Sequence, residues 1–97
     1  MLTSKQRSFL RAMANPLEPI FQVGKGGIGD TITNAISDAL AARELIKVRV
    51  LKNVDTDVRE VAEELAAQTG ADVVQVIGRN VVLYCRNAEE PKIELPR

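Results

Sequence analysis

The chain has 97 residues, 45% of them hydrophobic and 27% charged, which is typical of one soluble globular domain with a single modest core. Thirteen basic and thirteen acidic residues give a net charge of zero, and there is no histidine and one cysteine, Cys85. These counts exclude a histidine-activated nucleophile, a histidine or multi-cysteine metal site and an internal disulfide. Without a long apolar run or a secretory signal pattern, we expect a cytoplasmic protein that contacts no membrane and needs no cofactor.

The charges are unevenly distributed along the chain. Residues 1–52 carry eight Lys/Arg and four Asp/Glu, whereas residues 53–97 carry five Lys/Arg and nine Asp/Glu. This asymmetry predicts one basic surface and one acidic surface, and a basic surface can bind phosphate groups locally even in a neutral protein.

The first predicted element is a helix that begins at Thr3. Thr3 and Gln6 have the spacing of a capping box, in which the hydroxyl accepts a backbone N–H and the glutamine side chain reaches back. The segment "NPLEP", residues 15–19, ends the helix because proline disfavours helical backbone before it. Helical spacing places Phe9, Leu10 and Met13 on one face, and we expect Phe9 to lie in the core.

A strand at residues 20–23 leads into a glycine-rich loop, and a helix is predicted over residues 30–42. The next strand, residues 45–51, alternates apolar residues with Lys47 and Arg49. One face of this strand is therefore expected to be buried and the other to carry charge.

Glycines mark the boundaries of the later elements. Gly70 is a natural helix stop, and Gly78-Arg79 suits a type II′ hairpin turn, which needs glycine at its first central position. The remaining predicted elements are a helix over residues 55–69 and strands at residues 72–77 and 80–85.

The order α-β-α-β-α-β-β predicts an α/β fold with a four-stranded mixed sheet. Two right-handed β-α-β crossovers should place the second and third helices on the same side of adjoining parallel strands, so that helices cover only one sheet face. We find no repeat and no linker, and residues 1–97 are predicted to form one domain with an extended polar tail over about residues 88–97.

The glycine loop "VGKGGIGDT" fits two nucleotide-binding patterns incompletely. Gly24, Gly26 and Gly29 match a dinucleotide fingerprint, but no acid stands at the end of the following strand to bind a ribose, and the chain is too short for both halves of that fold. A P-loop would need a second lysine where Asp30 stands. We interpret Asp30 instead as a helix N-cap and expect no nucleotide to bind.

The third pattern is G-x-x-G, in which Gly24 and Gly27 enclose Lys25 and Gly26. Loops of this kind clamp a single-stranded nucleic-acid backbone, because the missing side chains let phosphates approach the backbone amides. The alternative interpretation is a strand-to-helix turn that only requires positive φ angles.

Other basic residues favour the RNA interpretation. Lys47 and Arg49 project from a strand expected beside the first one, and Arg79 lies at a hairpin tip, so a basic track beside the loop is predicted. The sequence leaves open whether Arg7 and Arg11, four apart on the first helix, face the same way as Lys47. Because aromatic residues are scarce, backbone recognition should dominate over base stacking.

A second function class stays open. The third helix carries an acidic face suited to docking on a basic ribosomal protein, although such faces are usually only solvated. Its acidic residues are Asp57, Glu60, Glu63 and Glu64.

Four separated segments resemble the CRM domain family (chloroplast RNA splicing and ribosome maturation), in its stand-alone bacterial YhbY-like form. They are "LTSKQRSFLRAMANPLEPIFQVGKGG", "ELIKVRV", "QTGADVVQVIGRNVVLY" and "KIELPR". The resemblance implies a fold like the C-terminal domain of translation initiation factor three, RNA binding without catalysis, and an association with precursor large ribosomal subunits, with 23S rRNA or the precursor particle as the expected partner. It places the family's GxxG loop on residues 24–27 and its basic strand and hairpin positions on Lys47 and Arg79.

Overall fold

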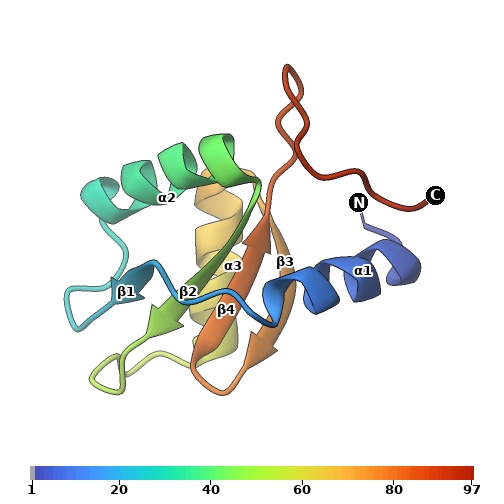
Figure 1. Ribbon diagram of the computed structural model, residues 1–97. Coiled ribbons are helices and arrows are strands. Elements are labelled where there is room, and N and C mark those ends of the chain that lie inside the picture. Colours follow the sequence, from blue (N-terminus) through green and yellow to red (C-terminus); the bar gives the residue numbers. More distant parts are fainter. Residues whose placement is uncertain (1) are drawn as a thin grey trace.

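The computed structural model describes residues 2–97 and has the predicted order of elements (Figure 1). A four-stranded mixed sheet lies between α1 on one face and α2 and α3 on the other. The helices are α1 (Ser4–Ala14), α2 (Asp30–Arg43) and α3 (Val58–Thr69), and the strands are β1 (Phe21–Val23), β2 (Leu45–Val50), β3 (Asp72–Ile77) and β4 (Asn80–Tyr84). Within the described residues, no helix is long and apolar enough to cross a membrane.

The strand order is β1-β2-β4-β3. β1 and β2 are adjacent and parallel, as predicted, whereas β4 pairs antiparallel with β2 on one side and β3 on the other. The prediction that both crossovers join adjoining strands is therefore wrong for β2-α3-β3, where β4 lies between the two parallel strands. The four successive apolar residues Val81–Tyr84 are all buried, which is the pattern of a central strand covered on both faces.

The larger core lies between the sheet and the α2–α3 pair. Val48 and Val50 of β2 point into it and meet Ile36 of α2 and Leu65 of α3, and all four side chains are fully buried. The alternating pattern of β2 thus assigns its two faces correctly, with Lys47 and Arg49 on the side away from these helices.

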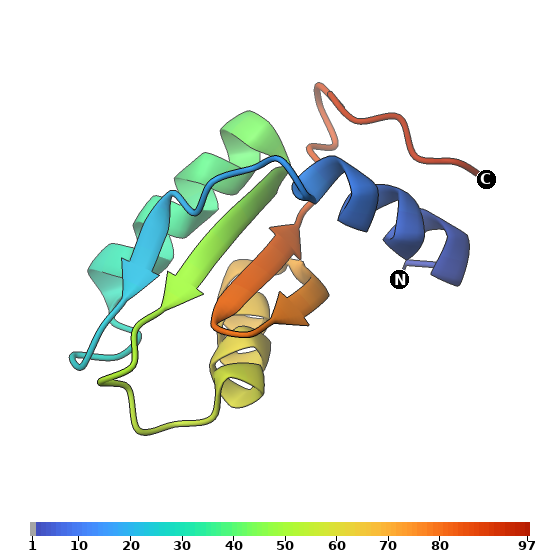
Figure 2. The same ribbon diagram turned by 60° about the horizontal axis from the view of Figure 1, so that its bottom comes forward.

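A second, smaller core lies under α1, on the opposite face of the sheet (Figure 2). Leu10 and Ala14 of α1, one turn apart, pack on Leu45, Val82 and Tyr84. The expectation that helices cover only one face is therefore wrong, because α1 covers part of the other.

The start of α1 follows the sequence prediction, and its buried face does not. Thr3 Oγ1 accepts a hydrogen bond from the Gln6 amide at 3.1 Å, and Gln6 Oε1 accepts one from the Thr3 amide at 3.1 Å, which completes the capping box. Phe9 is 38% exposed and Met13 is 40% exposed. The prediction that Phe9 lies in the core is wrong, because the i, i+4 pair Leu10 and Ala14 forms the face that packs on the sheet.

Residues 85–97 contain no helix or strand and lead back toward the start of α1 (Figure 1). Ile93 and Leu95 pack against the second core, and Gln6 Nε2 donates a hydrogen bond to the Pro96 carbonyl at 3.0 Å. The predicted extended tail is therefore held against the domain along part of its length.

Glu44 fastens this tail. It is the one residue between α2 and β2, it has a φ of 65°, and its side chain is fully buried. Glu44 Oε2 accepts a hydrogen bond from the Asn87 amide at 2.7 Å, and Oε1 accepts bonds from the amides of Lys92 and Ile93 at 2.6 and 2.7 Å. One carboxylate thus joins the end of a helix to two separate points of the tail.

Candidate nucleic-acid interface

The glycine loop between β1 and α2 forms an exposed turn. The Gly27 amide donates to the Gly24 carbonyl at 2.8 Å, which leaves Lys25 and Gly26 at the tip, both exposed. Gly27 has a φ of 73°, so a positive φ is needed at only one of the four positions. A Cβ atom built on Gly26 would meet nothing within 4 Å, so the backbone at the tip is open to a ligand.

The loop ends at the first turn of α2, and here one prediction is wrong. The N-cap is Gly29, and Asp30 is the first helical residue, with no side-chain capping hydrogen bond at this helix end. Asp30 still places a carboxylate in the first turn, where it stabilises the helix dipole and adds a negative charge beside the glycine loop.

The end of β2 lies next to the glycine loop. Because β1 and β2 are parallel, the loops that follow them leave the sheet at the same edge (Figures 1 and 2). The Leu51 amide donates to the Val23 carbonyl at 2.9 Å, and a Cβ atom on Gly24 would lie 3.5 Å from the Leu51 side chain. The exposed Lys52 therefore projects from the same edge as Lys25. Sequence reasoning missed Lys52, although parallel pairing of the two predicted strands was a signal for it.

Lys47 and Arg49 lie on the sheet face away from α2 and α3, as predicted. Arg49 is exposed and pairs with the exposed Gln22 of β1, and Lys47 is half-buried. On the other side of β2, Arg49 pairs with Asn80 of β4, whose Oδ1 is buried without a hydrogen-bond partner among the described residues. Lys47 lies beside the last residues of α1 and Arg49 is exposed, so this part of the sheet face offers two cations together with amide groups.

Arg79 is held by the protein itself. Its Nε donates to the Val50 carbonyl at 2.8 Å and its Nη2 donates to the Leu51 carbonyl at 2.7 Å. The guanidinium thus binds the backbone carbonyl groups at the end of β2. The preceding Gly78 has a φ of 57° and Arg79 does not have a positive φ, as a type II′ turn requires. Two of the five guanidinium N–H groups are used, which leaves three for another partner at the same edge of the sheet.

Arg7 and Arg11 are not brought beside the glycine loop. Arg7 donates from Nη1 to the Val73 carbonyl and so fastens α1 to β3, which is the sheet edge opposite β1. Arg11 Nη2 donates to Ser8 Oγ at 2.9 Å, within α1. In Figure 1, α1 and the glycine loop lie on opposite sides of the molecule. The basic set that the fold assembles therefore consists of Lys25, Lys47, Arg49, Lys52 and Arg79.

The model of the CRS1 / YhbY (CRM) domain matches residues 2–85. The chain belongs to the CRM domain family.

The chain has bacterial relatives that it matches over nearly their whole length. The chain is 52% identical to the Bacillus subtilis protein named probable RNA-binding protein YqeI, over 99% of this chain and 100% of that protein. It is 38% identical to a Haemophilus influenzae protein named RNA-binding protein, over 99% of this chain and 96% of that protein. The solution structure of the hypothetical protein SAV1595 from Staphylococcus aureus matches with a TM-score of 0.84 and 49% identity, over 99% of this chain and all of that one. The mixed α/β architecture is thus that of an experimentally determined relative.

Proposed function

We propose that this CRM domain binds RNA and acts, without catalysis, on 23S rRNA in precursors of the large ribosomal subunit in the cytoplasm. The observation that carries the proposal is the exposed Lys25–Gly26 tip beside the strand β2, whose face away from α2 and α3 carries Lys47 and Arg49. The relatives named as RNA-binding proteins support the same ligand class. The ribosomal setting comes from the family resemblance.

The contact is made to the RNA backbone. Phosphates approach the open tip at Gly26 while Lys25 supplies charge, and the strand continues over Lys47 and Arg49. Of the aromatic side chains, Tyr84 is buried and Phe21 packs against the larger core, so neither offers a stacking platform on this face. Recognition through backbone and shape follows from this arrangement.

The test is a double substitution, Lys25→Ala with Lys47→Ala, measured by binding to large-subunit rRNA fragments over a range of salt concentrations. Two lost phosphate contacts should weaken binding and make the log–log salt dependence less steep by about 1.4 units for single-stranded RNA. The matched control is Lys5→Ala with Lys92→Ala, which removes the same charge from exposed positions on α1 and the tail. Circular dichroism checks that both proteins are folded. Binding by Lys25→Ala with Lys47→Ala that equals the wild type would reject this interface.

A second candidate function uses the opposite side of the molecule. The acidic residues of α3 and its N-cap are all exposed, and α3 lies on the sheet face opposite Lys47. A basic ribosomal protein could dock there while RNA occupies the other face. Pull-down of precursor particles after nuclease treatment distinguishes the two candidate functions. If the protein still binds the particles after the RNA has been digested, contacts with ribosomal proteins are favoured. The exposed acids are Asp57, Glu60, Glu63 and Glu64.

A further inference from the structure

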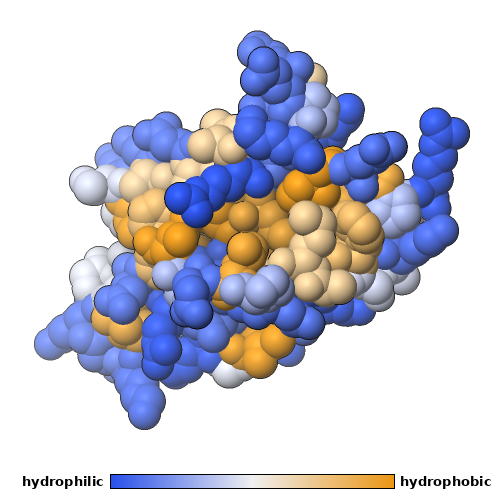
Figure 3. Space-filling model, in the orientation of Figure 1, coloured by the Kyte–Doolittle hydropathy of each residue, from blue (hydrophilic) through white to orange (hydrophobic). Residues whose placement is uncertain are grey.

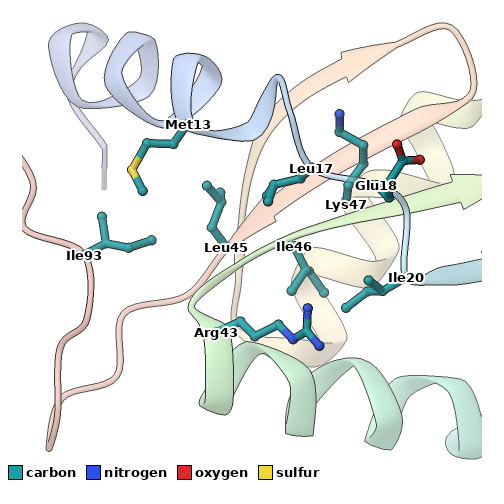
Figure 4. Close-up of a pocket in the computed structure, with 9 residues that line it drawn as sticks. All are labelled: Met13, Leu17, Glu18, Ile20, Arg43, Leu45, Ile46, Lys47 and Ile93. Carbon is teal, nitrogen blue, oxygen red and sulfur yellow. The ribbon is translucent and has the colours of Figure 1, made fainter.

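A pocket of about 240 Å³ lies where the end of α1, the segment after it and the start of β2 meet (Figure 4). Met13 closes it on the α1 side, Leu17 and Ile20 come from the connecting segment, and Leu45 and Ile46 form its floor. The walls are therefore mainly aliphatic, and two of the elements that supply them, α1 and β2, contribute residues to the cores.

The pocket leaves apolar side chains in contact with water. Met13 is 40% exposed, and Leu17 and Ile20 are each 37% exposed, although all three are large hydrophobic residues. Figure 3 shows the resulting apolar area on the face where α1 lies. Clustered exposed apolar groups beside a concave site are typical of a surface that a ligand covers.

Charged groups surround this apolar interior. Lys47 and Glu18 lie together at one side of the pocket, and Arg43 of α2 lies at another (Figure 4). Because Lys47 and Arg43 outnumber the single carboxylate of Glu18, the pocket suits a ligand that has an apolar body and anionic groups attached to it. An unpaired nucleotide has this chemistry, with a flat base and a flanking phosphate on each side.

The pocket is continuous with the proposed RNA-binding face through Lys47, which lines the pocket and also belongs to the cationic face of β2. An RNA strand that follows Arg49 and Lys47 therefore passes the mouth of the pocket. The interior can take up a base that the strand turns out of its stack, and the aliphatic walls then cover the base faces.

We propose that this pocket binds an unpaired guanine of the RNA, a proposal that rests on the RNA-binding function above. The Glu18 carboxylate accepts hydrogen bonds from guanine N1–H and the 2-amino group, which are adjacent donors suited to the two oxygens of one carboxylate. Uracil offers a single donor on that edge. Arg43 and Lys47 bind the flanking phosphates.

The experiment compares three RNA octamers by fluorescence anisotropy: all uridine, uridine with one central guanosine, and uridine with one central inosine, which lacks the 2-amino group. The wild-type protein should bind the guanosine octamer about 10-fold more tightly than the all-uridine octamer, with inosine between them. Glu18→Gln should remove most of this preference, because an amide places a donor against a guanine donor. Glu94→Gln, a change of another exposed acid outside the pocket, should keep it.

A second pair of variants tests the aliphatic walls. Met13→Ala should weaken binding of the guanosine octamer several-fold, whereas Phe9→Ala should not, although Phe9 is 38% exposed on the same helix. Both residues are solvent-exposed, so both variants should remain folded.

The outcomes separate the two proposals. If Lys25→Ala with Lys47→Ala weakens all octamers but the wild type binds guanosine and uridine equally, the guanine pocket is rejected and RNA binding stands. If no octamer or rRNA fragment binds the wild type, the RNA-binding function itself is rejected. If Met13→Ala reduces particle binding only after nuclease treatment, the pocket binds a protein and the guanine proposal is rejected.

Discussion

Glu44 is the residue whose environment departs most from what its type prefers. Burial by itself raises the pKa of the Glu44 carboxyl, but the hydrogen bonds from the amides of Asn87, Ile93 and Lys92, together with the Lys92 charge, lower the pKa overall below its usual value of 4.5. A buried carboxylate that accepts three backbone N–H groups is stabilised in its charged form. Glu44 therefore acts as an anionic clasp for the tail.

Replacing Glu44 by glutamine should destabilise the fold. The glutamine oxygen can accept from the Lys92 and Ile93 amides, but its NH₂ group then faces the Asn87 amide, donor against donor. We expect a loss of about 1–3 kcal/mol in the free energy of unfolding at pH 7, measured by urea denaturation. Asn87→Ala is the comparison, because it keeps the backbone amide that Glu44 binds and removes only side-chain bonds, to the Ala41 carbonyl and from the Glu89 and Glu90 amides. A Glu44→Gln protein as stable as the wild type would contradict the clasp.

The lowered pKa fixes the sign of the pH dependence in that experiment. The folded state binds fewer protons at Glu44 than the unfolded state, so this stabilisation is fully present above pH 4.5 and is lost as the pH falls through the folded-state value. Between pH 7 and pH 3 the wild type should thus lose more stability than Glu44→Gln. Parallel curves for the two proteins would show that Glu44 makes no such contribution.

Neither the burial of Glu44 nor the fastening of Arg79 could be predicted from the sequence. Each depends on backbone groups from a distant part of the chain: amides of residues 87, 92 and 93 for Glu44, and the Val50 and Leu51 carbonyls for Arg79. Residue type and local spacing gave Glu44 no role and made Arg79 a free hairpin-tip cation. Long-range hydrogen bonds of this kind have no periodic signature.

At the scale of elements, local patterns predicted more. The capping box of α1, the Gly70 helix stop with a φ of 74° and the two faces of β2 all follow from short-range rules and are confirmed. The position of β4 between β2 and β3 was not predicted, because a hairpin fixes only which strands pair and leaves open which edge of β2 receives the pair. The proximity of Lys52 to the glycine loop follows from the same strand arrangement.

The glycine loop gives a prediction at this scale, because its glycines have different roles. Gly26→Ala adds a methyl group to open space at a position without positive φ, so the melting temperature should be unchanged or slightly higher. If phosphates contact this backbone, the same methyl group should weaken RNA binding several-fold. Gly27→Ala should instead lower stability by about 1 kcal/mol, because its φ is 73°.

Gly29→Ala is the control for the Gly26 variant. It also adds a methyl group to open space without a positive φ, but at the α2 N-cap rather than at the turn tip. Thermal melting and RNA titration of the three variants separate conformational effects from contact effects. If Gly26→Ala bound RNA as tightly as the wild type, the turn would only connect β1 to α2, and the proposed phosphate contact at Gly26 would be wrong.

At the scale of the whole molecule, the fold separates its charges by face and closes its second core with the tail. The cationic positions of β2 and the acidic face of α3 lie on opposite sides of the sheet, which is how a neutral protein can present a phosphate-binding surface. The second core contains residues from α1, β2, β3, β4 and, through Ile93 and Leu95, the tail. Gln6 and Glu44 fasten the tail to α1 and to the end of α2.

A double-mutant cycle tests whether the clasp works through the tail. Removal of residues 87–97 deletes all three amides that Glu44 binds and the apolar contacts of Ile93 and Leu95, so the truncated protein should be less stable than the full chain. In the truncated protein Glu44→Gln should change the free energy of unfolding by less than about 0.5 kcal/mol, compared with about 1–3 kcal/mol in the full chain. The measurement is urea denaturation of the four proteins at one temperature where all are folded. Equal effects of Glu44→Gln in both backgrounds would show that Glu44 stabilises the α2–β2 junction on its own, since the two changes would then be additive.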